Sequence, residues 1–291
     1  MSVTYSISSP FPRLTKDSMR FLLPVLLLSV CVPCAGAQDT TNSSTSQTAA
    51  APQENSAKAK ALIDQAIQAL GGQTYLSIQN MSQQGRTYSF HRGEATSAGT
   101  LFWRFTKFPD RERIELTKQR DVSYVYNGDK GFEITFKGTA ALDDKALSEY
   151  LRRRDHSLEL VLRKWINEPG VALFYEGAAV AANKPAEQVT IMNAKNDSVT
   201  LSLDTNTHLP LKKMFTWRDP TDNLRNTEEE VYDAYRSTQG IMTPYSVTRS
   251  YNGEMSNQRF LNTVTYNDAM NDSMFDAKTT YDPNTLPPRK K

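Results

Sequence analysis

The sequence predicts an α+β protein built on a strongly curved antiparallel sheet, an unclosed half β-barrel. Three observations lead to this fold class. Roughly ten segments alternate apolar and polar residues, as antiparallel strands with one buried face do. Only two segments repeat apolar residues at helical spacing. A sheet of so many strands rarely stays open without curling, and its concave apolar face then needs a helix to cover it.

Two helices are predicted, a short one near the N-terminus and a long one in mid-chain. The first spans residues 58–70 and stops at Gly71-Gly72. The second starts at the capping residue Asp143 and runs to Ile166, ahead of Pro169-Gly170. Its apolar stripe is expected to cover the concave face of the sheet. The lid residues predicted on that stripe are Leu147, Leu151, Leu158, Val161, Leu162 and Trp165.

Strands are predicted wherever apolar residues recur at every second position. The clearest signal is a hairpin of residues 122–126 and 132–136, joined by the turn Asn127-Gly-Asp-Lys130. Further strands are expected at 101–105, 199–203, 209–217, 231–235, 245–251 and 260–266. The side chains predicted to face a cavity are Leu101, Trp103, Phe105, Tyr124, Tyr126, Phe132, Ile134, Phe136, Phe215 and Trp217. For any one of them the alternative is packing in the core. The cavity hypothesis rests on the mismatch between a broad apolar sheet and one covering helix.

The N-terminal 37 residues have the features of a cleavable secretion signal. Met19-Arg20 supplies a positive start, residues 21–32 a short apolar core, and Ala35-Gly-Ala37 a small-residue cleavage site. The apolar stretch is shorter than the roughly 20 residues of a membrane span. Translation could start at Met1 or at Met19. A periplasmic or secreted protein is therefore predicted, with no integral membrane span once the signal is cleaved near Ala37.

Cysteine content and charge both change when the signal is removed. Cys31 and Cys34 lie within it, so the processed chain is predicted to have no thiol chemistry. The full chain has 34 basic and 32 acidic residues, but residues 1–37 hold three of the basic and one of the acidic ones, which leaves 31 of each. A neutral chain without a basic stripe gives no reason to expect nucleic-acid binding.

Composition divides the remaining chain into three parts. Residues 38–57 are small and polar and are predicted to be a flexible leader, because such a stretch buries too little apolar surface to order itself. Residues 58–278 form the half-barrel domain. Residues 279–291 are a Pro-rich basic tail. A monomer is expected.

The sequence shows no recognisable catalytic or metal-binding motif. His91, His156 and His208 are scattered, without metal-ligand spacing. Asp155-His156-Ser157 contains the residue types of a catalytic triad, but neighbours on a helix point about 100° apart, so a solvated helix face is predicted instead. No catalytic residue, metal or cofactor is therefore predicted, and the protein is expected not to be an enzyme.

Three consecutive arginines, Arg152, Arg153 and Arg154, lie on the predicted mid-chain helix. Consecutive helical positions sweep about 200°, so at least one of them flanks the apolar stripe. Two interpretations remain open. The arginines serve solubility, or they contact a lipid headgroup or an acidic partner at the mouth of the cavity.

Several segments, taken in order, resemble a known family. The strand Gly99-Thr-Leu-Phe-Trp-Arg-Phe105 runs into Lys107-Phe-Pro-Asp-Arg-Glu-Arg-Ile-Glu115, and Val125-Tyr-Asn-Gly-Asp-Lys-Gly131 forms a hairpin. Leu203-Asp-Thr-Asn-Thr-His-Leu-Pro-Leu211 then has the pattern of a strand pair, and residues 231–244 that of a late strand and turn. This succession resembles the lipoprotein carriers and receptors LolA, LolB and RseB over roughly residues 57–276.

The resemblance implies an unclosed β-barrel whose helices cover a hydrophobic cavity that receives acyl chains. One difference is the single long lid helix predicted here, where the family has several short ones. The expected function is a periplasmic, non-enzymatic carrier or binding protein for a lipid or an acylated lipoprotein. The alternative is a protein-interaction or envelope-sensor module of the RseB type, with an envelope protein as partner. An open apolar cavity would favour the carrier, and an interior filled by its own side chains the interaction module.

Overall fold

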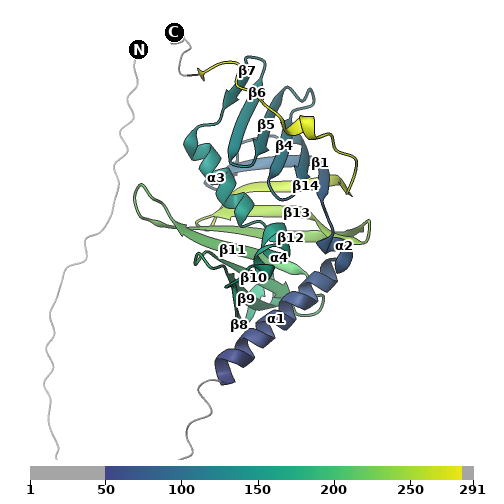
Figure 1. The fold of residues 1–291 in the computed structure, drawn as a ribbon, viewed down its shortest axis with the longest axis vertical. Coiled ribbons are helices and arrows are strands. Elements are labelled where there is room, and N and C mark those ends of the chain that lie inside the picture. The colour runs from purple at the N-terminus through teal and green to yellow at the C-terminus, as the bar shows by residue number, and fades with distance from the viewer. Residues whose placement is uncertain (1–49, 284–291) are drawn as a thin grey trace, which may run out of the picture. The chain divides into compact units, whose positions relative to one another are not determined.

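The computed structural model describes residues 50–283, and Figure 1 shows their arrangement. The predicted fold class is confirmed, because a curled, unclosed antiparallel sheet of 14 strands is accompanied by a few helices. The first group of strands is β1 (Asn80–His91), β2 (Glu94–Ala95), β3 (Thr100–Lys107), β4 (Arg111–Leu116), β5 (Val122–Asn127), β6 (Lys130–Thr135) and β7 (Gly138–Ala141). The second group is β8 (Ala172–Ala181), β9 (Lys184–Met192), β10 (Ser198–Asp204), β11 (Pro210–Arg218), β12 (Arg225–Thr238), β13 (Ile241–Tyr251) and β14 (Glu254–Tyr266).

The two groups of strands form one sheet through the pairing of β1 with β14. The strand order is β7-β6-β5-β4-β3-β1-β14-β13-β12-β11-β10-β9-β8, and β2 pairs with β1 off this path. Gln83 of β1 pairs with Val264 of β14 on one side and with Arg104 of β3 on the other. Residues directly opposite in antiparallel strands share a face of the sheet. Side chains from distant parts of the sequence are therefore brought to one concave surface.

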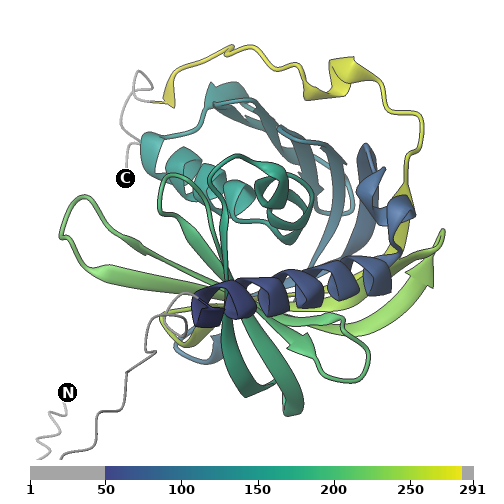
Figure 2. The same cartoon turned by 60° about the horizontal axis from the view of Figure 1, so that its bottom comes forward.

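The main core lies between the concave face of the second strand group and helices from two parts of the chain. Helix α1 (Ala50–Leu70) contributes Ile63 and Leu70, helix α4 (Leu158–Arg163) contributes Val161 and Leu162, and β10 contributes Leu201, all at most 2% exposed. A short helix, α2 (Gln73–Leu76), follows α1. Helix α1 thus covers the sheet together with the mid-chain helices, whereas a single helix was predicted to provide the cover (Figure 2).

The long helix predicted over residues 143–166 is divided in the structure. Asp143 caps α3 (Asp144–Asp155) as predicted, and its carboxylate accepts from the amide of Ala146 at 2.9 Å. A second helix, α4, and a 3-10 turn, η1 (Trp165–Asn167), follow. The division falls at Ser157, whose backbone is extended and whose hydroxyl accepts from the amide of Leu160. A serine side chain in that position replaces a helical main-chain bond and starts a new helix.

His156, at the division, is not on a solvated face as predicted. It is 9% exposed and stacks on Phe215, with ring centroids 4.3 Å apart. Its Nδ1 lies 2.7 Å from the carbonyl oxygen of Arg152. The imidazole is therefore part of the packing between helix and sheet.

The described residues also extend into the segments predicted as leader and tail. Helix α1 begins at Ala50, so residues 50–57 of the predicted leader are helical. After β14 and a 3-10 turn, η2 (Asp272–Phe275), the chain runs along the outer face of the first strand group (Figure 2). There Phe275 is fully buried, and the amides of Thr280 and Tyr281 donate to the carbonyl of Thr139 in β7. The predicted signal, residues 1–37 with both cysteines, lies outside the described residues.

Candidate functional site: a charged cavity beneath helices α3 and α4

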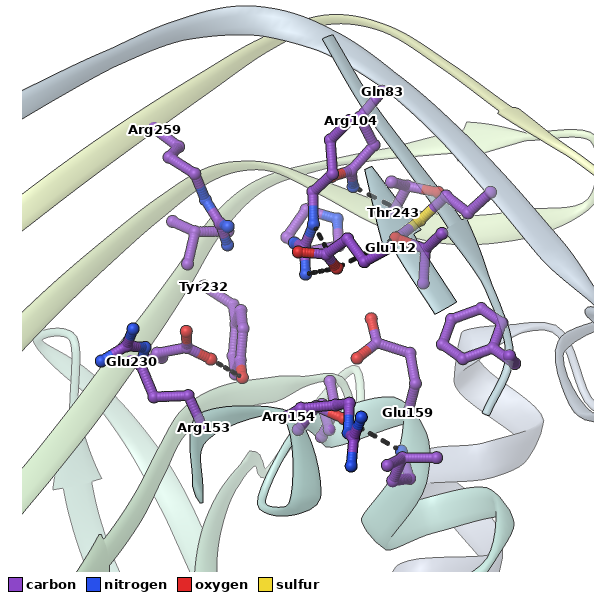
Figure 3. A pocket seen from close by; sticks show the side chains of 18 of the residues that line it. Gln83, Arg104, Glu112, Arg153, Arg154, Glu159, Glu230, Tyr232, Thr243 and Arg259 are labelled. Atoms are coloured by element: carbon purple, nitrogen blue, oxygen red, sulfur yellow. Dashed lines mark hydrogen bonds and ion pairs between the residues drawn. The ribbon is translucent and has the colours of Figure 1, made fainter. Parts of the chain in front are cut away.

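A cavity of about 240 Å³ lies between the concave face of the sheet and helices α3 and α4 (Figure 3). Helix α3 contributes Tyr150, Arg153 and Arg154, and α4 contributes residues 158–160. Strands of both groups form the opposite wall, and Leu70 of α1 belongs to the lining as well. Cavities that hold drug-sized ligands measure about 300–1,000 Å³, so this one is slightly smaller.

The cavity wall combines apolar side chains with an excess of positive charge. Its apolar part consists of Leu70, Met81, Phe108, Ile114, Leu158, Leu160, Ile241, Met242, Val247 and Leu261. Seven cationic side chains line it: Arg104, Arg111, Arg153, Arg154, Lys213, Arg249 and Arg259. Three carboxylates oppose them: Glu112, Glu159 and Glu230. The wall therefore has four more positive than negative groups, where the resemblance implied a hydrophobic cavity.

Arg104 of β3 and Glu112 of β4 form a buried ion pair in the wall. The Nε and Nη2 of Arg104 donate to one oxygen of Glu112 at 2.9 and 2.6 Å, and the hydroxyl of Thr106 donates to the same oxygen at 3.2 Å. Burial acts to lower the pKa of Arg104, but the charge and hydrogen bonds of Glu112 outweigh it and raise that pKa. Both charges are thus satisfied within the protein.

A second buried pair joins Lys213 of β11 to Glu230 of β12. The Lys213 ammonium lies 2.8 Å from a Glu230 oxygen, and the hydroxyl of Tyr232 donates to Glu230 at 2.9 Å. The Lys213 side chain is only 2% exposed. Burial acts to raise the pKa of Glu230, but the charges of Lys213 and Arg259 and the hydrogen bonds from Lys213 and Tyr232 outweigh it, so this pKa lies below its ordinary value. This pair too is internally balanced.

Arg249 of β13 and Arg259 of β14 lack such partners. Among the described residues, no carboxylate oxygen lies within 4.0 Å of either guanidinium, and neither guanidinium makes a side-chain hydrogen bond. Burial lowers the pKa of both, and neighbouring positive charges add to the effect, chiefly Arg153 on Arg249 and Arg104 on Arg259. The charges of Glu228 and Glu230 on Arg249, and of Glu230 and Glu112 on Arg259, act in the opposite direction but do not outweigh it. Arg259 and Arg153 point into the same space from opposite walls (Figure 3).

The part of the wall near Glu159 has the opposite charge. The Glu159 carboxylate forms no ion pair or hydrogen bond with another described residue, and it points into the cavity from α4 (Figure 3). Its charge adds to burial in raising the pKa of Tyr75 and of Tyr266. The Tyr75 hydroxyl is buried without a hydrogen-bond partner among the described residues. The cavity thus has two sides of opposite charge. Arg249 and Arg259 mark the positive side, and Glu159 marks the negative one.

The structure places most of the predicted cavity residues elsewhere. Tyr126 alone of the ten lines the cavity, with its ring stacked on Tyr150 of α3 at 3.4 Å. Phe105 pairs with Arg113, and Phe132 with Val125, on the face opposite to Arg104 and Glu112. By the same alternation, Leu101, Trp103 and Ile134 lie on this outer face.

The remaining predicted cavity residues have varied positions. The Tyr124 hydroxyl donates to Glu133 at 2.9 Å, and Phe136, beyond the end of β6, is 91% exposed. Phe215 is 2% exposed in the main core. Trp217 lies 3.9 Å below the guanidinium of Arg152, outside the cavity.

The predicted lid and arginine residues are divided in a similar way. Of the lid residues, Leu158 lines the cavity, while Val161, Leu162 and Trp165 are buried in the core. Leu147 packs over Gly131, where an added Cβ would come within 2.9 Å of a Leu147 methyl, and Leu151 is half-buried. Of the three arginines, Arg153 and Arg154 line the cavity and Arg152 does not.

Eight charged residues of the cavity were not predicted from the sequence, and four of them, Lys213, Glu230, Arg249 and Arg259, come from the second group of strands. Lys213 and Arg249 interrupt the apolar series of their strands, Lys213 between Leu211 and Phe215 and Arg249 between Val247 and Tyr251. The signal that could have found them is the strand register, in which Glu230 pairs with Lys213 on one side and Arg249 on the other. That register depends on strand order, which alternation alone does not supply.

Within residues 50–283, no set of three or more His, Cys, Asp or Glu side chains is arranged to hold a metal ion. In the same range, no helix has both the length and the apolar character needed to cross a membrane.

Comparison with solved structures identifies the fold. A DUF1329 family protein from Desulfovibrio piger superposes with a TM-score of 0.52 and 13% identity, over 75% of this chain and 97% of that one. A domain from Vibrio parahaemolyticus, described as an outer membrane lipoprotein-sorting protein, gives 0.51 and 9% over the same shares. The chain has the fold of these two proteins. A LolA superfamily protein from Nitrosomonas europaea gives a TM-score of 0.49 at 8% identity, again over 75% and 97%.

The resemblance predicted from the sequence is therefore confirmed at the level of the fold. No family model and no curated protein matches the sequence. At these identities the shared property is the half-barrel and its covering helices, and function has to be argued from the cavity.

Proposed function

We propose that the protein is a non-enzymatic binding protein of the cell envelope, periplasmic or secreted, that carries an amphiphilic ligand beneath helices α3 and α4. The ligand class is a lipid or the acylated end of a lipoprotein, held without covalent chemistry or cofactor. The observation that carries the proposal is the cavity, whose wall joins apolar side chains such as Leu158 and Leu261 to charged ones. An amphiphile is the class of ligand that matches both parts of this wall.

The fold and the sequence support the same proposal. The half-barrel is shared with a domain described as an outer membrane lipoprotein-sorting protein. The first 37 residues have the pattern of a secretion signal, which would bring the protein to the compartment where such ligands occur.

The cavity volume limits what fits without movement. At about 240 Å³ the cavity lies below the range of about 300–1,000 Å³ that holds drug-sized ligands. A head group with its first carbons fits that space, and a long acyl chain requires α3 and α4 to move away from the sheet. Each methylene buried gains about 0.8 kcal/mol, so a long chain can offset the opening of apolar contacts along α4.

A second candidate function is an interaction or sensor module on the same scaffold. The observation in its favour is that side chains fill the concave side of the second group of strands, where Val161 and Leu162 of α4 are fully buried. In that case the helices would present a surface to an envelope protein and the cavity would hold water.

Native mass spectrometry of the protein, purified from its own compartment without detergent, tests the proposal. The expected result is additional mass that organic solvent extracts and that corresponds to an amphiphile. A clean protein mass that stays unchanged when lipid is added would contradict the carrier and favour the interaction module.

A further inference from the structure

The positive charges of the cavity fall into two groups according to their partners. Arg104 and Lys213 have carboxylate partners inside the cavity, Glu112 and Glu230. Arg111 is paired with Asp272 at 3.4 Å, outside the cavity lining. Arg154 lies 3.2 Å from Asp155, and Arg153 lies 3.9 Å from Glu149.

Arg249 and Arg259 form the second group, since no described carboxylate lies within 4.0 Å of either. An arginine side chain stays protonated in proteins, so these charges cannot be removed by losing a proton. A charge withdrawn from bulk water costs free energy unless an opposite charge or hydrogen bonds compensate it. Here the nearby charges of Arg104 and Arg153 add repulsion. The charges of Glu228 and Glu230 act on Arg249, and those of Glu230 and Glu112 act on Arg259, but none of these carboxylates forms an ion pair or hydrogen bond with either arginine. The two guanidiniums therefore present donors that no described side chain accepts.

The two arginines also mark one side of a polar-to-apolar gradient. Val247 lies two residues from Arg249 on β13, and Leu261 two residues from Arg259 on β14, and all four line the cavity. Farther along the same strands follow Ile241 and Tyr266. The charge of the Glu159 carboxylate raises the pKa of Tyr266 and repels anions from that side of the cavity. A ligand with one anionic end would thus have a single favoured orientation.

We propose that Arg249 and Arg259 bind the anionic group, a carboxylate or a phosphate, of an amphiphile whose apolar part lies along Val247 and Leu261. Guanidinium groups suit this role, because their planar donors match carboxylate and phosphate oxygens in pairs. Arg153, facing them from α3, adds positive charge from the helix side. This inference rests on the function proposed above, since it assigns the head group of that ligand.

Displacement of the neutral dye Nile red measures the affinities that test the proposal. The competitors are dodecanoate, dodecyl phosphate, the neutral analogue dodecanol and inorganic phosphate. Both anionic amphiphiles are expected to bind at least about tenfold more tightly than dodecanol. The binding free energy of a hydrogen bond to a charged group corresponds to about this factor in affinity. The double variant Arg249→Gln/Arg259→Gln should bind the anionic amphiphiles no better than dodecanol, with dodecanol affinity unchanged. Arg113→Gln, whose arginine lies on the outer face of the sheet and is paired with Glu115, is the matched control and should keep the preference.

Thermal unfolding without ligand supplies a readout that does not depend on binding. The double variant should unfold at the same or a higher temperature than the wild type, because two repelling charges are removed. Arg104→Gln should unfold at a lower temperature, since it leaves Glu112 buried and unpaired. A loss of stability in the double variant comparable to that of Arg104→Gln would make the two arginines structural and overturn the inference.

The binding outcomes separate this inference from the proposed function. Equal affinity for dodecanol and dodecyl phosphate, or a preference that survives in the double variant, overturns the anion site and leaves the amphiphile carrier standing. Binding of none of the amphiphiles overturns both. Inorganic phosphate binding as tightly as dodecyl phosphate would assign the arginines to a free anion and overturn the amphiphile as their ligand.

Discussion

The carboxamide of Asn55 pairs with the main chain of Tyr175 in both directions. The Tyr175 amide donates to Asn55 Oδ1 at 2.9 Å, and Asn55 Nδ2 donates to the Tyr175 carbonyl at 2.8 Å. Strand β8 is an edge of the sheet, so this side chain on α1 occupies the place of a further strand. At the opposite edge, the amide of Thr280 donates to the Thr139 carbonyl of β7, and the Thr280 hydroxyl accepts from the Thr139 amide. Exposed edges are sites of unwanted strand pairing, and both edges of this sheet are partly covered.

Replacing Asn55 by alanine should therefore expose the edge of β8. The amide and carbonyl of Tyr175 would lose their partners, at a cost of about 1–3 kcal/mol in the free energy of unfolding. Urea unfolding measures this loss, and light scattering with size exclusion detects self-association through the freed edge. Asn55→Asp is the control, because its carboxylate still accepts from the Tyr175 amide, and its effect should be intermediate. A fully stable, monomeric Asn55→Ala protein would show that the pairing does not protect the edge.

Shortening Leu158 should enlarge the cavity, since this side chain is 6% exposed and lies in its wall. A Leu→Ala change in a core costs about 2–5 kcal/mol in stability. The space left beside the cavity should increase the affinity for Nile red. Val161→Ala is the matched control, because Val161 is buried on the same helix but does not line the cavity. Equal dye affinities of the two variants would mean that Leu158 does not limit the space available to a ligand.

The fold followed from the sequence because it depends on patterns that are local. Alternation identified eight of the 14 strands but missed β1, β2, β4, β7, β8 and β9. The glycine pair at residues 71 and 72 ended the first helix as predicted. Which side chains lie on the concave face was harder to predict from the sequence. On β3 the apolar residues Trp103 and Phe105 suggested the inner face, yet Arg104 and Thr106 occupy it. Both faces of these strands are covered, the outer one by the segment that contains Phe275, so apolar character does not distinguish them.

The charged wall of the cavity depends on contacts between residues far apart in the sequence. Glu230 has the pattern of a solvated residue until its register neighbours Lys213 and Arg249 are known. Asn55 lies in a segment whose polar composition predicted a flexible leader, and its order comes from a partner 120 residues away. In both cases the pairing that gives the residue its role is absent from the local pattern.

Removing the hydroxyl of Ser157 should weaken the junction between α3 and α4. That hydroxyl accepts from the Leu160 amide at the start of α4, and loss of such a cap costs about 1 kcal/mol. The expected result is a lower urea midpoint for Ser157→Ala with an unchanged slope. Ser148→Ala is the control, because Ser148 is exposed within α3 and alanine favours helix at such a position. A Ser157→Ala protein as stable as the Ser148→Ala protein would mean that the Ser157 cap does not stabilise the junction between α3 and α4.

The burial of His156 predicts a stability that decreases as the pH falls below neutrality. Burial against Phe215 lowers its pKa below the ordinary value of 6.5, although the hydrogen bond to the Arg152 carbonyl acts in the opposite direction. Between the folded pKa and 6.5 the unfolded chain binds more protons at this residue than the folded chain. Stability therefore rises with pH through this window and is lost as the pH falls through it.

The comparison of wild type with His156→Gln isolates this contribution, because glutamine keeps a donor for the Arg152 carbonyl but does not titrate. Thermal unfolding of both proteins between about pH 7 and pH 5 should show a wild-type stability that falls more steeply, by at most about 1.4 kcal/mol per pH unit for one proton. Carboxylates such as Glu230 are present in both proteins, so their effect cancels in the difference. Parallel pH profiles would mean that His156 titrates alike in the folded and unfolded states, and that the stacking on Phe215 does not exclude the charged imidazole.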